Sequence, residues 1–265
     1  MRIASAGHAA FAAVMIAFGI LGLVKGDFTV VWEPVPKTIP ARELLVYLCA
    51  LVSLASGVGL LLQRTAALAA RVLLAFFVLW LLVWRIPGLF QLSLVEGTWS
   101  LGKTLVMTAG AWVLFVWFAT DWDRQRFGWA TGDKGLRIAR VLYALGLIPF
   151  GLAHFLYPKE TAVLVPGWLP WHMAWAYFTG GTFIAASLAI LVGVYARLAA
   201  ALSALQMGPF GLLVWFPIVA TTFLTPFQWG EVVITIALTA AGWVVADSYR
   251  DTPWLALGNR SEIKA

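Results

Sequence analysis

The sequence predicts an all-α integral membrane protein with about eight transmembrane helices, organised as two tandem four-helix units. Of its 265 residues, 62% are hydrophobic and only 11% are charged, whereas a soluble domain carries about 25% charged residues. Long apolar runs recur along the chain, and landmarks of the first half return in the same order in the second half. The composition excludes a water-soluble fold, and the repeat predicts two units.

The expected spans follow from length and from breaks in the apolar runs. A hydrocarbon core about 30 Å thick needs roughly 20 apolar residues in a helix. Pro87 in the third span, and Pro209 and Pro217 in the seventh, are expected to kink or break these helices, so seven or nine spans stay open. The expected spans are 8–26, 42–63, 66–88, 100–120, 137–157, 172–194, 197–220 and 227–247.

The distribution of cations predicts the orientation. Of the 18 Lys and Arg residues, all but six fall on the side that holds both termini and the 121–136 segment. The six on the other side are Lys25, Lys37, Arg42, Arg85, Lys103 and Lys159. Because Lys and Arg accumulate in cytoplasmic loops, we expect both termini in the cytoplasm. The expected location is a prokaryotic plasma (inner) membrane.

The composition also argues against several kinds of function. The net charge of +6 does not predict nucleic-acid binding, because the basic residues separate apolar runs instead of gathering on one solvated face. Cys49 is the single cysteine and lies in an apolar run. It can form no intrachain disulfide or iron–sulfur cluster, and we expect a buried small side chain there and no metal site.

The repeat defines the expected domain boundaries. The matched landmarks are Phe18-Gly19 with Phe150-Gly151, Val35-Pro36 with Val165-Pro166, Pro40 with Pro170, Tyr47 with Tyr177, Arg64 with Arg197, and Gly102 with Gly230. We expect a first unit at 1–120, a cytoplasmic linker at 121–136, a second unit at 137–250 and a cytoplasmic tail at 251–265. Because each unit has an even number of spans, the two units insert with the same orientation.

Several stretches of the second half carry a resemblance to a known family. They are ALGLIPFGLAHFLYP, the VPxxxP loop, GGTFIAASLAILVGVYARLAA and QWGEVVITIALTAAG. Together they resemble the DoxX family of small four-helix membrane proteins. The first half matches more weakly and lacks the HF pair that ends the opening helix of the second. The chain as a whole is similar to a tandem double DoxX protein.

The resemblance implies a membrane subunit more than a self-contained enzyme. DoxX proteins are named for membrane subunits of a thiosulfate:quinone oxidoreductase, and their fold is similar to that of eukaryotic cargo receptors that are not enzymes. No agreed catalytic residues carry over to this chain. The resemblance therefore implies a partner enzyme and a quinone or lipid ligand, without an intrinsic cofactor.

Lys103 and Glu231 are the first candidate site. Polar groups at membrane depth are costly and are functional candidates by default. The repeat places the two residues at equivalent positions, beside Gly102 and Gly230. We expect them to form a buried polar pair or to line one cavity. The alternative is that both lie near the outer surface and extend their charged groups to water.

His154 and His172 are the second candidate site, with Trp168 between them. Both histidines flank the VPxxxP loop of the second half, so they should lie near the same membrane face. Imidazoles there can hydrogen-bond a quinone or a lipid head group. We expect the loop with Pro166 and Pro170 to cover a cavity lined by these three side chains. The alternative is that they are polar residues in the head-group region.

These observations lead to one functional hypothesis and one rival. We expect a membrane subunit that anchors or completes a quinone-linked oxidoreductase complex, in contact with membrane lipids and other protein subunits. The rival is a non-enzymatic protein, either a scaffold or assembly subunit of a larger membrane complex or a transporter-like carrier. The chain contains no phosphate-binding loop, HExxH motif or nucleophile elbow.

Overall fold

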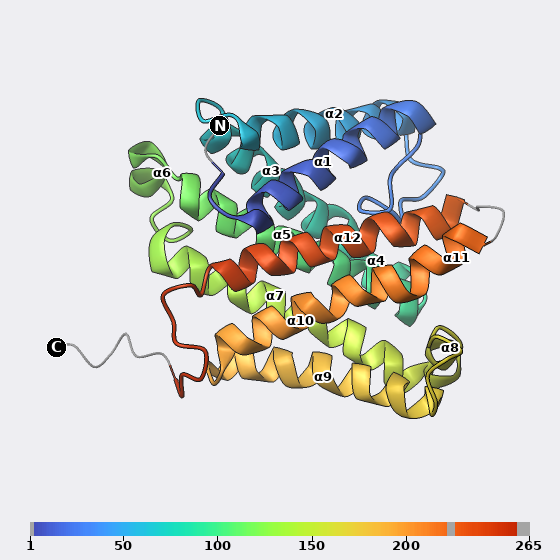
Figure 1. Ribbon diagram of the computed structural model, residues 1–265. Coiled ribbons are helices and arrows are strands. Elements are labelled where there is room, and N and C mark those ends of the chain that lie inside the picture. Colours follow the sequence, from blue (N-terminus) through green and yellow to red (C-terminus); the bar gives the residue numbers. More distant parts are fainter. Residues whose placement is uncertain (1–2, 222–225, 259–265) are drawn as a thin grey trace.

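The computed structural model describes residues 3–221 and 226–258 and shows a bundle of long helices without a β-strand in these ranges (Figure 1). Within this part of the chain, eight helical spans are long and apolar enough to cross a membrane. This confirms the predicted all-α integral membrane fold with eight spans. Large apolar side chains such as Leu79 and Leu82 face outward, where lipid would surround them.

The helices have the following bounds. The first half contains α1 (Ala6–Lys25), α2 (Arg42–Leu61), α3 (Ala66–Trp80), the π-helix η1 (Leu81–Arg85), α4 (Ile86–Gln91), α5 (Leu94–Phe118) and the short α6 (Asp121–Arg126). The second half contains α7 (Gly132–Leu156), the short α8 (Pro158–Val163), α9 (His172–Val192), α10 (Ala196–Phe210), the π-helix η2 (Gly211–Trp215), α11 (Phe216–Thr221) and α12 (Pro226–Asp247).

The prolines of the third and seventh spans do not break the helices. Each span passes through a five-residue π-helix just before the proline, and the N–H groups of Ile86 and Phe216 reach the carbonyls of Leu81 and Gly211. Such a wide turn is a common way to absorb a local disturbance within a continuous helix. Neither span is broken, although each contains an irregular turn; Pro209 lies within α10, and the third span continues to Gln91.

Two predicted boundaries also differ from the structure. The fourth span was expected from residue 100, but α5 begins at Leu94, where the Ser93 side chain caps the backbone N–H of Glu96. The fifth was expected from residue 137, but α7 begins at Gly132. Much of the expected 121–136 linker is therefore helical, since α6 also lies within it.

A buried ion pair holds α6 against the bundle. The Asp123 carboxylate is fully buried and accepts two hydrogen bonds from Arg71 of α3, at 2.7 and 2.9 Å. Burial alone would raise the pKa of Asp123, but hydrogen bonds from Arg71 and Thr120 outweigh it and hold the pKa below its usual value. The short helix is thus attached to the bundle by a charged contact.

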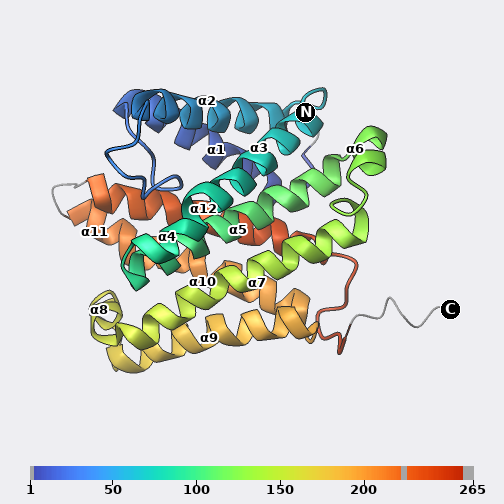
Figure 2. The same ribbon diagram turned by 180° about the vertical axis from the view of Figure 1, so that it is seen from behind.

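The helices form a closed ring in which the two halves interlock. Neighbours in the ring are α1, α2, α3, α5, α7, α9, α10 and α12, and α12 packs back against α1. In addition, α5 contacts α12 across the middle. Figure 2 shows α7 of the second half lying along α5 of the first. The fourth helix of each half therefore packs against the first helix of the other half.

The bundle has two distinct ends (Figure 1). The loop end carries residues 26–41, α8 and α11. The terminal end carries α6, the beginning of α1 and the end of α12. With an even number of spans, both ends of the described chain lie on one side, as Figure 1 shows.

Residues 40–91 correspond to residues 170–221 at a constant offset of 130 positions. The segments α2, α3, η1 and α4 begin 130 positions before α9, α10, η2 and α11, respectively. Even the unusual backbone recurs, because Ala41 (φ 53°) and Trp171 (φ 58°) both adopt a left-handed conformation just before α2 and α9. The correspondence supports the predicted tandem duplication, which remains an evolutionary proposal.

Glycines bring α7 and α9 into close contact. A Cβ atom on Gly180 would lie 2.7 Å from the Cβ of His154, and one on Gly151 would lie 2.9 Å from the carbonyl oxygen of Gly180. Larger residues would therefore force the two helices apart. This close crossing fixes the position of His154 at the loop end of α7.

Arg85 holds the first loop inside the bundle. Its side chain is only 1% exposed and donates hydrogen bonds to the carbonyl oxygens of Trp32, Glu33 and Pro34 at 2.7 to 2.9 Å. It also donates to Thr104 Oγ1 on α5. The guanidinium is thus committed to backbone carbonyls, of which that of Trp32 also accepts a hydrogen bond from Trp80 Nε1.

Replacing Arg85 by Met should lower the free energy of unfolding by roughly 3 kcal/mol, because three loop carbonyls lose a charged donor while they remain largely buried. Thermal unfolding in mild detergent, followed by circular dichroism, would measure the change. Lys37→Met, on the exposed part of the same loop, is the matched control and should leave the melting temperature unchanged. Equal effects of both substitutions would contradict this role for Arg85.

Candidate functional site

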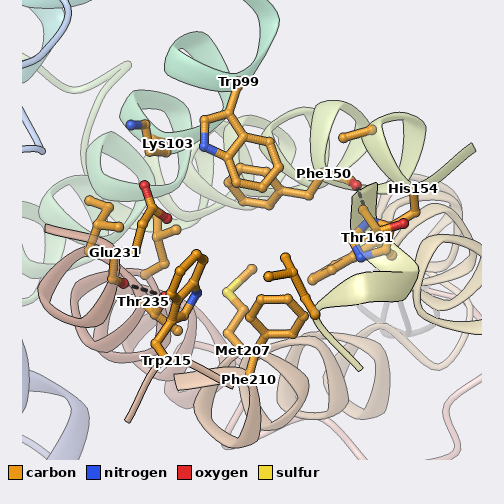
Figure 3. Close-up of a pocket in the computed structure, with 15 residues that line it drawn as sticks. Trp99, Lys103, Phe150, His154, Thr161, Met207, Phe210, Trp215, Glu231 and Thr235 are labelled. Carbon is orange, nitrogen blue, oxygen red and sulfur yellow. Dashed lines mark hydrogen bonds between the residues drawn. The ribbon is translucent and has the colours of Figure 1, made fainter. Parts of the chain in front are cut away.

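A cavity of about 120 Å³ lies near the loop end, between helices of both halves (Figure 3). Its wall is formed by α5, α7, α9, α10, η2 and α12, and α8 covers it from the loop side. Most of the wall is apolar. The aromatic side chains that line it are Trp99, Phe150, Phe183, Phe210 and Trp215. An enclosed aromatic wall with a few polar groups is typical of a site for a small ligand.

Lys103 and Glu231 lie together at one end of this cavity (Figure 3). Lys103 is only 7% exposed, so its ammonium group does not extend to the surface. The structure brings the predicted pair to one cavity, but they are not among the ion pairs within 4.0 Å that join described residues. No hydrogen bond of the Lys103 ammonium group is found among the described residues, and the carboxylates of Glu231 and Glu33 attract it from a distance. A buried cation that makes no direct contact with a carboxylate is costly, which marks this end of the cavity as a ligand-facing position.

His154 lies at the opposite end of the cavity (Figure 3). Its Nδ1 is 2.8 Å from the carbonyl oxygen of Phe150. Because a carbonyl only accepts, Nδ1 must carry the proton of this hydrogen bond, and Nε2 of the neutral ring is then an acceptor. Within residues 3–221 and 226–258, no partner of Nε2 is found. The imidazole thus has a fixed orientation and one unused acceptor.

Trp168 and His172 do not line this cavity. Trp168 is 71% exposed, and His172 is a half-buried residue at the start of α9. The physical reason is the short helix α8, which continues into a turn with hydrogen bonds from Leu164 and Val165 back to Thr161 and Ala162. That turn places Thr161 and Leu164 over the cavity. The residues beyond Pro166 are directed outward.

The aromatic wall was not recognised from the sequence. Its five rings come from α5, α7, α9, α10 and η2, so no single helix shows a distinctive pattern. Each ring alone resembles the many other aromatic residues of the chain. The only signal available was the offset of 130 positions, which pairs Phe210 with Trp80 and Trp215 with Arg85.

No cluster of metal ligands accompanies the cavity. Within the described residues, no group of three or more His, Cys, Asp and Glu side chains is placed to hold a metal ion. Cys49 is buried in α2 and does not line the cavity. The polar groups available to a ligand are the side chains of Lys103, Glu231 and His154 and the hydroxyls of Thr161 and Thr235.

Fold and site together define a multi-pass α-helical membrane protein with a ligand-sized cavity between its two halves. Comparison of the chain with family models, curated proteins and solved structures found no match. The likeness to the DoxX family therefore rests on the sequence stretches given above.

Replacing Lys103 by Met together with Glu231 by Gln should raise the free energy of unfolding by about 1 kcal/mol, because the double substitution removes both buried charges at similar side-chain size. Chemical or thermal unfolding in detergent would measure the change. Lys159→Met, an exposed residue of α8, is the matched control and should change little. A clear loss of stability in the double variant would show instead that this pair of charges supports the fold.

Proposed function

We propose that this protein binds the head group of a membrane quinone in the cavity and serves as a membrane subunit of a quinone-linked oxidoreductase. The observation that carries the proposal is an aromatic cavity with polar side chains at both ends, Lys103 and Glu231 at one and His154 at the other. The DoxX resemblance supports the same class of function. In this proposal the chain lies in a prokaryotic plasma membrane with its terminal end in the cytoplasm.

The shape of the cavity suits a planar ring. Flat apolar rings pack favourably against aromatic side chains, and a small number of polar groups then set their orientation. The volume of about 120 Å³ is close to the roughly 150 Å³ of an apolar protein cavity that holds benzene. Only the head group of a quinone therefore fits inside. Its isoprenoid tail would remain outside, among the helices and lipids.

The polar groups suit the chemistry of a quinone. Reduction adds two electrons and two protons, so that each carbonyl becomes a hydroxyl group. The two oxygens lie at opposite ends of a para-quinone ring, as Lys103 with Glu231 and His154 do in the cavity. We assign the supply or removal of electrons to a partner dehydrogenase. The role of this chain is to bind the ring, orient it and exchange protons with its oxygens.

A carrier is the second candidate function. Lys103 lies on α5 and Glu231 on α12, the helices that pack against each other between the two halves. A cation and a carboxylate at such an interface could bind a small zwitterion and change their contact as the halves move. A scaffold subunit is the corresponding alternative without a ligand. Neither alternative requires His154 to contact a ring.

The purified protein should retain a quinone or quinol and should bind a short-tail quinol, kept in the reduced form, in mild detergent. His154→Ala and Lys103→Met should each weaken this binding about tenfold, because each removes one polar contact with the ring. His172→Ala is the matched control and should bind as the original protein does, since His172 lies outside the cavity. Mass spectrometry would identify retained quinone, lipid and partner subunits, and titration would give the affinities. Absence of quinol binding, or equal binding in all variants, would overturn the quinone function.

The proposed orientation has its own test. Single cysteines at Lys37 and Lys159, both exposed at the loop end, should react with an impermeant thiol reagent added outside the cell. A cysteine at Arg124, exposed on α6 at the terminal end, should react only after the membrane is opened. Cys49 would be replaced by Ala in each variant. The reverse pattern of labelling would place the termini outside.

A further inference from the structure

The first half of the bundle holds an indole ring in its own interior. Trp32, from the loop before α2, is only 1% exposed. Its ring stacks on Phe77 with centroids 4.9 Å apart and meets Trp80 edge-on at 5.2 Å. Its Nε1 donates a hydrogen bond to Ser53 Oγ at 3.2 Å. The loop therefore inserts a planar aromatic group between α2 and α3 and satisfies its polar atom.

Three of the four side chains that contact the Trp32 ring have counterparts that line the cavity, whereas the fourth, Phe76, corresponds to Gln206, which does not. At the offset of 130 positions, Ser53, Phe77 and Trp80 correspond to the residues of α9 and α10 that face the empty space. These counterparts are Phe183, Met207 and Phe210. The cavity of the second half thus includes positions that surround the indole in the first.

The residue of the second half that corresponds to Trp32 is much smaller. The counterpart of Trp32 is Ala162, three residues before Val165 as Trp32 is three residues before Val35. Ala162 is buried, and its neighbours Thr161 and Leu164 cover the cavity. The corresponding sequence position thus carries a methyl group in place of an indole, and Ala162 itself is not among the residues that line the cavity. The space that this exchange leaves is consistent with a cavity of about 120 Å³.

In the second half, the hydrogen-bond acceptor lies on a different helix. The position of Ser53, which accepts from the indole, is taken by Phe183, which offers no acceptor. His154 of α7 lies beside Phe183, with ring centroids 6.0 Å apart, and its Nε2 is the unused acceptor described above. An aromatic group that entered the second cavity with an N–H or O–H group would therefore find its acceptor on His154.

We propose that the cavity binds a planar aromatic ligand of one or two fused rings that donates a hydrogen bond to Nε2 of His154, in the manner of Trp32 in the first half. The inference rests on the proposed ligand-binding function and narrows it. Applied to quinones, it selects the reduced form, because a quinol hydroxyl donates whereas a quinone carbonyl only accepts. The proposed ligand site of the second half then corresponds to the position of the Trp32 ring in the first half.

Two isosteric probes test the inference. In 5-fluoroindole the ring carries an N–H donor, and in 5-fluorobenzofuran an oxygen takes its place with nearly the same shape. Fluorine NMR of each probe with the full-length protein in detergent would report binding. Ala162→Trp should fill the cavity and remove specific binding, so it provides the baseline for probe dissolved in the micelles. Ala162→Phe, with a smaller ring, serves as a second cavity-filling variant.

The original protein should bind 5-fluoroindole at least tenfold more tightly than 5-fluorobenzofuran, as expected for loss of one buried hydrogen bond. His154→Phe should abolish this preference while binding persists, and His172→Phe should retain it. Equal affinity for both probes, with both lost in Ala162→Trp, would overturn the donor requirement but leave the ligand-binding function intact. Binding that neither cavity-filling variant reduces would overturn the cavity as the site.

The first half supplies an independent measurement. Trp32→Ala should open a second cavity with Ser53 as its acceptor, so the number of 5-fluoroindole molecules bound per chain should rise from one to two. The probe should also raise the melting temperature of Trp32→Ala more than that of the original protein. A folded Trp32→Ala protein that binds no additional probe would show that the two halves do not offer equivalent ring sites.

Discussion

Polar groups buried at membrane depth must find their hydrogen-bond partners within the protein. The two halves of the bundle meet this requirement differently. In the first half it is met by Arg85, which donates to three loop carbonyls and to Thr104. In the second half the corresponding position is Trp215, an aromatic residue that lines the cavity. Lys103 and Nε2 of His154 face the same space without a hydrogen-bond partner among the described residues.

The same helical framework therefore supports one interior filled by an indole ring and one interior that contains a cavity. Helices α2 to α4 and α9 to α11 follow each other at a constant offset, with a π-helix at the same place in each. What differs is the loop before them. In the first half the loop inserts Trp32 and is held by Arg85. In the second half the loop forms α8, and a cavity lies beneath it.

The cavity is expected to lower the free energy of unfolding. A well-packed interior has few voids larger than a water molecule, and an unfilled aromatic cavity forgoes dispersion contacts. An ammonium group that makes no direct contact with a carboxylate adds a further cost. Features that weaken the empty protein but suit a ligand are the usual mark of a functional site. The close packing of α7 and α9 at Gly151 and Gly180 shows that this bundle can pack tightly where no ligand is needed.

The sequence by itself determined the membrane class and the approximate position of the eight spans, because a 20-residue apolar run has few stable alternatives to a spanning helix. It also brought Lys103 and Glu231 to attention as residues of one site. The tertiary structure alone decided that His154 joins them while Trp168 and His172 do not, since α8 turns the loop outward before those residues. Likewise, only the structure showed Arg85 inside the protein. A cavity remains where side chains do not fill the space that several helices enclose. Its size is the difference between the volume of that space and the volume of those side chains. That difference depends on the rotation and crossing of each helix, which a pattern along one segment does not record.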